Sequence, residues 1–447
     1  MLQHTGYFKI KEMMMKNLKA IIVAGFALFA MFFGAGNLIF APYLGITTGT
    51  QWVSSLIGFG ITDVGFVTLA LVAAMRAGGS LKDMGKKVSP KFGWVFATAI
   101  ILAIGPGFAT PRTGATAYEM VKVSFMPNLN AWIACGIFFA AAYYFCRSEN
   151  SALDKVGGIL TPGLLITVAL IIVKAIITPI GPIVEVETQN VFTAGFLEGY
   201  QTMDSFGAMA FVALVIANLR NAGIREEDMK KSFGKVILIA CISLMLIYFG
   251  LGHMGATMSG LDLGNIERVQ LLIKGTHMLL GNFGVGLLCI AMCLACLTTA
   301  VGCTASVGNF FNELTRGKLS YKRAVLISCI LSYFISVKGV EAILALALPA
   351  LIALYPISVA LCICNVLPKR WNNHATQLGA VVGAAFPGIF TFLNFAVMKE
   401  NVWDNFSLMF PDWFQLFTWL IPSMIIAVLL NFILPNKEPM ILSEEEA

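Results

Sequence analysis

Long apolar stretches separated by short polar connections dominate the pattern of this chain. Most stretches reach roughly 20 residues, the length that an α-helix needs to cross the hydrocarbon core of a bilayer. Twelve such spans can be placed. They cover residues 20–45, 51–76, 92–122, 130–146, 153–178, 195–219, 233–255, 278–311, 321–337, 340–366, 375–398 and 411–434. The pattern therefore predicts an all-α polytopic membrane protein with 12 transmembrane helices.

The composition agrees with a chain that is immersed in lipid. Of the 447 residues, 58% are hydrophobic and 12% are charged, against about 25% charged residues in ordinary soluble domains. So few charges cannot cover the surface of a soluble globule of this size. A soluble enzyme, a nucleic-acid-binding module and a disordered protein are therefore excluded.

The basic residues predict the orientation of the spans. If the N-terminus is inside, 23 of the 30 Lys and Arg residues fall on the cytoplasmic side, as the positive-inside rule requires. An even number of spans then places the C-terminus inside as well. We expect a multi-pass protein of the cell membrane with cytoplasmic tails at 1–19 and 435–447, and the net charge of +6 reflects this topology.

Two of the spans contain interruptions. The first holds Phe33–Asn37 (FGAGN) at its middle, and the sixth holds Gly199–Gly207 (GYQTMDSFG). Glycine is a poor helix former, and in lipid an opened backbone survives only where it lines a protein cavity. The alternative interpretation is that the glycines merely permit close helix packing.

The interruptions open two sets of five spans, residues 20–180 and 195–366. Because five is odd, the second set must enter the membrane from the opposite side, which predicts an inverted 5+5 repeat. Broken helices at matching places in such repeats point to a transporter's binding site. The last two spans, within 375–434, lie outside the repeat and are expected to support packing or dimerisation.

The ends of a broken helix carry partial charges that can bind a ligand. A half-helix ends in free carbonyls that attract a cation, and the next begins with free N–H groups that attract an anion. A zwitterionic amino acid can bind there without any charged side chain. Thr298 and Thr299 lie in the otherwise apolar eighth span and offer hard oxygen ligands to sodium, although their hydroxyls can instead bond to carbonyls of their own helix.

Three ionisable residues fall inside predicted spans and mark possible coupling or gating positions. Asp63 lies midway along the second span, where it either carries a proton or is held neutral by a hydrogen bond between helices. Asp204 lies at the second interruption and is a candidate for a cation site. Arg112 precedes Glu119 by two helical turns, which predicts a structural or gating pair between them.

Other functional classes find little support. A channel is expected to show a repeated pore loop or filter segment, and a membrane enzyme needs clustered catalytic groups. The four histidines fall in no such motif, and the ten cysteines lie mainly in apolar runs as small hydrophobic residues. The sequence therefore predicts neither an enzyme nor a metal cluster of cysteine and histidine.

Several motifs resemble one family of transporters. Gly34–Pro42 (GAGNLIFAP) resembles the break in the first helix of the leucine-transporter fold, and Phe33–Phe40 (FGAGNLIF) resembles the signature of the branched-chain amino acid:cation symporters, the system II carrier proteins. Gly105–Thr113 and Gly195–Asp204 also resemble that family. The likeness extends over nearly the whole chain.

The resemblance implies import of leucine, isoleucine and valine, driven by Na+ symport through alternating access. It implies a sodium site made by the carbonyls of Ala30, Phe33 and Ala295 and the hydroxyls of Thr298 and Thr299. It implies that the substrate is bound by Gly34, Gly36, Asn37, Tyr200, Gln201, Phe206 and Phe108. In this set, Gly34, Gly36 and Asn37 meet the carboxylate, carbonyls near Tyr200 and Gln201 meet the ammonium, and the aromatic rings contact the aliphatic side chain.

The sequence leaves the proton as an alternative to sodium as the coupling ion of such a transporter. In proton-coupled relatives of the fold, a lysine midway along the fifth span takes the place of sodium. Here Lys155 is too early in the span and Lys174 too late, which favours sodium. The alternative is a proton-coupled importer in which Asp63 carries H+.

Overall fold

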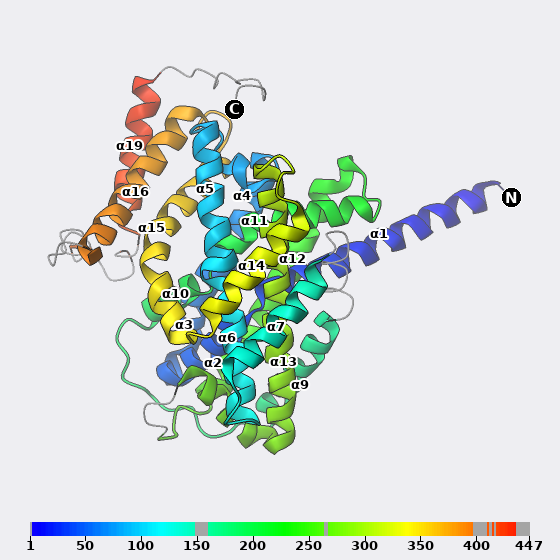
Figure 1. The fold of residues 1–447 in the computed structure, drawn as a ribbon, viewed down its shortest axis with the longest axis vertical. Helices are drawn as coiled ribbons and strands as arrows, with labels where there is room; N and C mark the ends of the chain where they lie inside the picture. Colours follow the sequence, from blue (N-terminus) through cyan, green and yellow to red (C-terminus); the bar gives the residue numbers. More distant parts are fainter. Residues whose placement is uncertain are drawn as a thin grey trace.

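The structure is a computed structural model that describes residues 2–147, 160–262, 267–396, 409–410, 414 and 417–434. Helices make up most of this part of the chain, and it contains no strand. The helices pack side by side in one bundle, from which the N-terminal end of α1 projects (Figure 1). The first part consists of α1 (Leu2–Phe32), α2 (Ala35–Thr48), α3 (Trp52–Gly60), α4 (Phe66–Ala77), α5 (Pro90–Leu102), α6 (Ala109–Ser124), α7 (Ala131–Cys146) and α9 (Thr161–Ile177).

The second part repeats the theme of helices joined by short connections. It consists of α10 (Val191–Gln201), α11 (Asp204–Asn221), α12 (Glu226–Ala256), α13 (Arg268–Leu314), α14 (Tyr321–Ser336), α15 (Val340–Val366), α16 (His374–Ala396) and α19 (Leu420–Ile433). Helices α16 and α19 pack against each other at one edge of the bundle, beside α15 (Figure 1).

Residues 2–19, which were expected to form a tail, continue α1 as helix. The expected C-terminal tail at 435–447 lies outside the described residues.

Both predicted interruptions are breaks between helices. The first separates α1 from α2 at Phe33 and Gly34, and the second separates α10 from α11 at Thr202 and Met203, where the axis bends by 42°. Met203 has a positive φ of 67°, which a non-glycine residue seldom adopts. The polypeptide therefore changes direction at the second break.

The structure also bends where the sequence predicted continuous spans. The span expected at 92–122 is interrupted by a π-helical turn, Ala103–Gly107, in which Gly105 leaves the helical conformation and Pro106 has no N–H to donate. A second π-helical turn, Ile61–Gly65, carries Asp63. Such turns are frequent at functional sites.

Within the described residues, four stretches are long and apolar enough to cross a membrane, namely 36–77, 90–124, 226–256 and 268–314, and two bent pairs bring the number to six. Five further apolar helices are shorter. Helix α13 begins ten residues before the expected span and is kinked at Gly281. The total of twelve spans and their inverted symmetry stay predictions.

Candidate functional site

The first break is built around Gly34. This residue has an extended backbone, and its N–H lies 2.6 Å from the Phe32 carbonyl and 3.3 Å from Oδ1 of Asn37. A Cβ atom at Gly34 would lie 2.8 Å from Oγ1 of Thr299. Only glycine therefore allows α13 to approach the break this closely.

The last turn of α1 meets the two adjacent threonines of α13. Oγ1 of Thr298 donates to the carbonyl of Ala30 at 2.7 Å and also lies 2.9 Å from the carbonyl of Ala295. Oγ1 of Thr299 donates to the carbonyl of Met31 at 2.9 Å. Thr298 thus bonds both within its own helix and across to α1. Of the residues expected around sodium, hydrogen bonds join Ala30, Ala295 and Thr298, whereas Thr299 bonds to Met31.

The second break is held by Arg112 of α6. Its guanidinium donates to the carbonyl of Gln201 at 2.6 Å and to the carbonyl of Thr202 at 2.9 Å. The expected pairing of Arg112 with Glu119 is wrong, because Glu119 instead accepts the backbone N–H of Val340 at 3.2 Å. Arg112 therefore caps the C-terminal end of α10, where the helix dipole is negative.

A buried polar cluster joins both breaks. Nδ2 of Asn37 donates to Oδ2 of Asp204 at 2.7 Å, and it lies 2.6 Å from the hydroxyl of Tyr248 and 3.4 Å from Oδ1 of Asp63. All four residues are less than a tenth exposed. Oδ2 of Asp63 has no hydrogen-bond partner among the described residues. The cluster places two carboxyl groups in a water-poor interior, where an uncompensated charge is costly.

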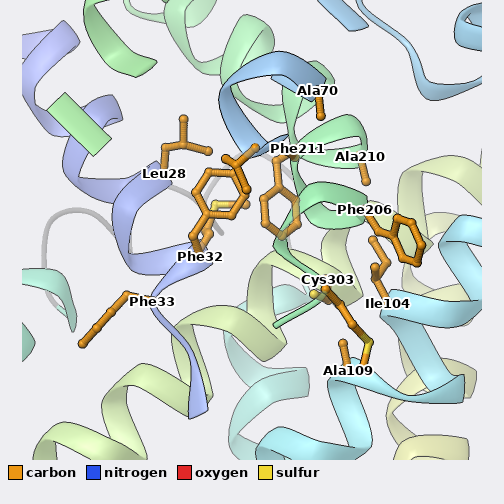
Figure 2. Close-up of a cluster of buried hydrophobic side chains, with 14 of the residues drawn as sticks. Leu28, Phe32, Phe33, Ala70, Ile104, Ala109, Phe206, Ala210, Phe211 and Cys303 are labelled. Atoms are coloured by element: carbon orange, nitrogen blue, oxygen red, sulfur yellow. The ribbon is translucent and has the colours of Figure 1, made fainter. Parts of the chain in front are cut away.

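A small cavity of about 20 Å³ lies between the two breaks, with room for about one water molecule. Its polar wall consists of Asn37, Arg112, Thr113, Thr202, Asp204 and Thr299. Its apolar wall consists of Met31, Phe32, Ile104, Ala109, Met203, Phe211 and Cys303. Figure 2 shows the rings of Phe32 and Phe211 side by side and Ile104 close to Cys303. The cavity is therefore amphipathic.

Several residues expected to contact a substrate lie apart from this cavity. Tyr200 and Phe206 each pack against Tyr355, with ring centroids 4.4 Å apart in both pairs. Neither these two residues nor Gly36, Gln201 or Phe108 are among the residues that line the cavity.

Sequence reasoning missed Tyr248 and the aromatic pair Phe32 and Phe211. They lie in apolar runs and carry no signal that separates them from core residues.

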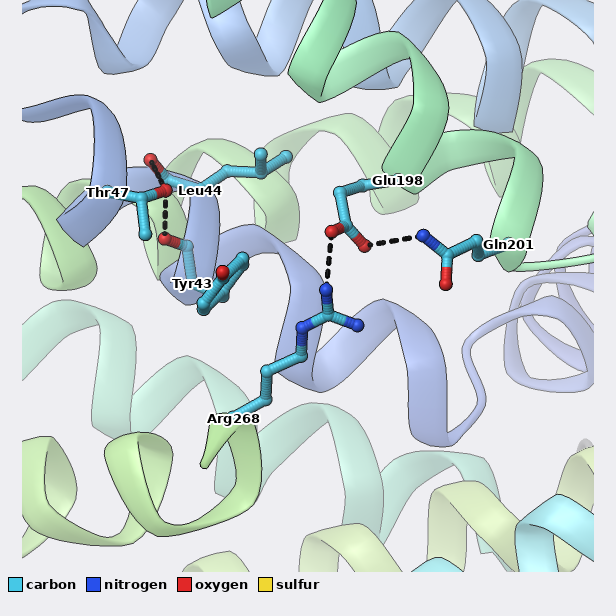
Figure 3. A network of polar contacts seen from close by, with 6 residues as sticks. All are labelled: Tyr43, Leu44, Thr47, Glu198, Gln201 and Arg268. Carbon is cyan, nitrogen blue, oxygen red and sulfur yellow. Dashed lines mark hydrogen bonds and ion pairs between the residues drawn. The ribbon is translucent and has the colours of Figure 1, made fainter. Parts of the chain in front are cut away.

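An ion pair links three helices at one side of the site (Figure 3). Nη2 of Arg268, at the start of α13, lies 2.6 Å from Oε1 of Glu198 on α10. Nε2 of Gln201 reaches the other carboxylate oxygen at 3.3 Å. The guanidinium also stacks 4.6 Å from the ring of Tyr43 and 5.1 Å from that of Phe40, both on α2, so it ties α13 to both broken helices.

The whole chain is similar to known transport proteins. A family model described as branched-chain amino acid transport protein matches residues 17–437. The branched-chain amino acid permease BraB of Bacillus subtilis is 33% identical over 94% of this chain and 97% of its own length. The branched-chain amino acid transport system 2 carrier protein of Pseudomonas aeruginosa is 33% identical over 92% of this chain and 94% of its own.

Solved structures share the fold. A Na+-coupled sialic acid symporter superposes with a TM-score of 0.62 over 93% of this chain and 90% of its own, at 13% identity. Mhp1, a nucleobase-cation-symport-1 family transporter, superposes with a TM-score of 0.57 over 94% of both chains, also at 13% identity. At such identities the likeness concerns the fold alone.

Proposed function

This chain belongs to the family of branched-chain amino acid transport proteins, and we propose that it imports leucine, isoleucine and valine across the cell membrane by sodium symport. The family consists of transporters and not of enzymes. The observation that carries the proposal is the meeting of two broken helices at one amphipathic cavity, because a zwitterion with an aliphatic side chain needs both kinds of wall.

The sodium ion is proposed to bind between α1 and α13. The hydroxyl of Thr298 lies within 2.9 Å of the carbonyls of Ala30 and Ala295, and the hydroxyl of Thr299 lies beside Gly34. These are hard oxygen donors, which suit an alkali cation. The carbonyl of Phe33 completes the proposed set. Sodium at this place neutralises the negative end of α1 and joins it to α13.

The substrate is proposed to bind next to the sodium, at the first break. Its carboxylate meets the N–H groups that begin α2, at Gly34, Gly36 and Asn37, where the helix dipole is positive. Its aliphatic side chain meets the apolar wall that includes Phe32 and Phe211.

A role for Tyr200, Gln201, Phe206 and Phe108 at the substrate requires a more open conformation. The cavity of about 20 Å³ has room for one water molecule and not for an amino acid, so the proposed transport cycle requires states in which this cavity is wider. Alternating access between these states takes place within the proposed inverted repeat. Sodium fixes the first break and improves the substrate site, and by linkage the substrate then tightens sodium binding. Both termini are proposed to be cytoplasmic.

Proton coupling is the second candidate. Asp63 is fully buried in a π-helical turn, and one of its carboxylate oxygens has no partner among the described residues. A proton on this oxygen would remove the cost of burying a charge there. Under this candidate, Asp63→Asn abolishes uptake driven by a proton gradient, and unchanged uptake rejects it.

The experiment that tests the function is thermal stabilisation of the purified protein, with each of the twenty amino acids, in sodium and in choline chloride. A ligand that binds the native state raises the melting temperature. The proposal predicts stabilisation by leucine, isoleucine and valine that is larger in sodium. Stabilisation by other amino acids only, or by none, rejects the substrate class.

A further inference from the structure

The carbonyls at the end of α10 are already occupied by a cation of the protein itself. Arg112 donates to Gln201 and Thr202 at 2.6 and 2.9 Å and is only 6% exposed. Charge-assisted hydrogen bonds of this kind are among the strong ones. An ammonium group that used the remaining lone pairs of these carbonyls would lie beside a buried guanidinium of like charge, so the substrate's positive end needs another acceptor.

Asp204 is the acidic side chain that lines the cavity. It is 7% exposed, and Oδ2 accepts one hydrogen bond from Nδ2 of Asn37 at 2.7 Å. A carboxylate has about four acceptor positions, so Asp204 retains capacity for a further donor. Asp63 lies in the same polar cluster but does not line the cavity.

We propose that Asp204, in place of the carbonyls that end α10, accepts the ammonium of the substrate, while Arg112 keeps those carbonyls closed to it. This inference rests on the proposed function and names the group that recognises one end of the amino acid. It differs from the interpretation drawn from the broken helices alone, in which backbone groups bind both ends without charged side chains.

The polarity of the cavity fits this assignment. A Cβ atom at Gly36 would lie 3.4 Å from Nη2 of Arg112, so the guanidinium is adjacent to the N-terminal end of α2 and adds to its positive potential. Asp204 supplies the negative potential at the same cavity. A zwitterion placed between them has its carboxylate toward α2 and Arg112 and its ammonium toward Asp204.

The test compares leucine with 4-methylpentanoate, which is leucine without its ammonium. Both compete with radiolabelled leucine for the purified full-length protein in sodium, or stabilise it against heat where binding is weak. For the wild type we expect leucine to bind on the order of 100-fold more tightly than 4-methylpentanoate. In Asp204→Asn this ratio falls to within a few fold of one, because only leucine loses affinity. Asp204→Glu, which retains the charge, keeps most of the ratio.

Glu119→Gln is the matched control, since it also turns a carboxylate into an amide, at a residue that accepts the backbone N–H of Val340 and does not line the cavity. It is expected to preserve the ratio. A ratio that is unchanged in Asp204→Asn, or that collapses equally in Glu119→Gln, overturns the inference.

Asp204→Ser repeats the test should Asp204→Asn fail to fold, because it also removes the carboxylate but leaves a smaller side chain. A ratio near one in Asp204→Ser supports Asp204, and a ratio like that of the wild type overturns the inference. A wild-type protein that binds no branched-chain amino acid would instead reject the proposed function.

Discussion

The hydroxyl of Thr298 lies 2.7 Å from the carbonyl oxygen of Ala30, a residue 268 positions earlier in the chain. This contact joins the last turn of α1, just before the first break, to the middle of α13. In the proposed cycle, sodium binds at this junction. The contact is therefore the place where loading of the ion and the shape of the substrate site are coupled.

Thr298→Ala removes one oxygen ligand and the hydrogen bond to α1. We expect the sodium concentration that gives half-maximal leucine uptake to rise at least about fivefold, since loss of a well-placed ligand or bond is worth about 1–3 kcal/mol. Ser306→Ala is the control, because Ser306 lies on the same helix and its hydroxyl donates to the carbonyl of Gly302 in its own helix. Equal sodium dependence of the two variants would contradict the proposed site.

Gly34→Ala places a Cβ atom 2.8 Å from Oγ1 of Thr299. Because no real side chain tolerates this distance, the break and α13 must move apart. We expect sodium-dependent thermal stabilisation to be lost while the protein still folds. Gly234→Ala is the control, since nothing lies within 4 Å of its Cβ position, and it should retain sodium binding and gain up to about 1 kcal/mol in stability. Sodium stabilisation of Gly34→Ala like that of the wild type would argue against the geometry.

The sequence predicted the broken helices because glycine and polar residues stand out in apolar runs. Thr298 and Asp204 also stood out because polar residues are rare in such a chain, whereas Asn37 came from the resemblance to the family. The structure brings Asn37 and Asp204 to the cavity and Thr298 to α1, and the roles of all three stay predictions. The sequence did not predict the partner of Arg112, because a spacing of seven residues favours a contact on the same helix, whereas the carbonyl of Gln201 is 89 residues away.

Other features carry no pattern at all in the sequence. Tyr248 and Phe211 look like ordinary core residues, and only the packing of α12 and α11 brings them to the site. The π-helical turn at Asp63 adds one residue to a helical turn without a proline to mark it. Tertiary packing, and not local propensity, decides these positions.

Ile104→Val tests the apolar wall. Ile104 is buried beside the cavity and loses one methylene group in this variant, so a larger substrate gains room. We expect the ratio of leucine to valine uptake to rise on the order of tenfold, because one methylene group is worth about 1–3 kcal/mol. Ile100→Val, at a buried position that does not line the cavity, should leave the ratio as in the wild type. A similar change in both variants would remove Ile104 from the site.

The pair Arg268 and Glu198 is expected to hold the start of α13 against α10. The two side chains are 24% and 11% exposed, so water screens their attraction only in part. In a double-mutant cycle of Arg268→Gln and Glu198→Gln, each single variant should lower the melting temperature, and the double variant should lower it little further.

The exposed pair Arg220 and Glu226, with side chains 59% and 67% exposed, provides the comparison. It should show little or no coupling, because water screens an exposed pair. Additive effects at Arg268 and Glu198 would show that the ion pair does not bind the two helices together.

The most direct test of the account is leucine uptake into proteoliposomes that contain the purified protein, with either a sodium gradient or a proton gradient and the membrane potential clamped at zero. The account predicts leucine accumulation above its equilibrium level with an inward sodium gradient at equal pH on both sides. It predicts no accumulation with a proton gradient alone. Accumulation driven by the proton gradient and indifferent to sodium would contradict the account.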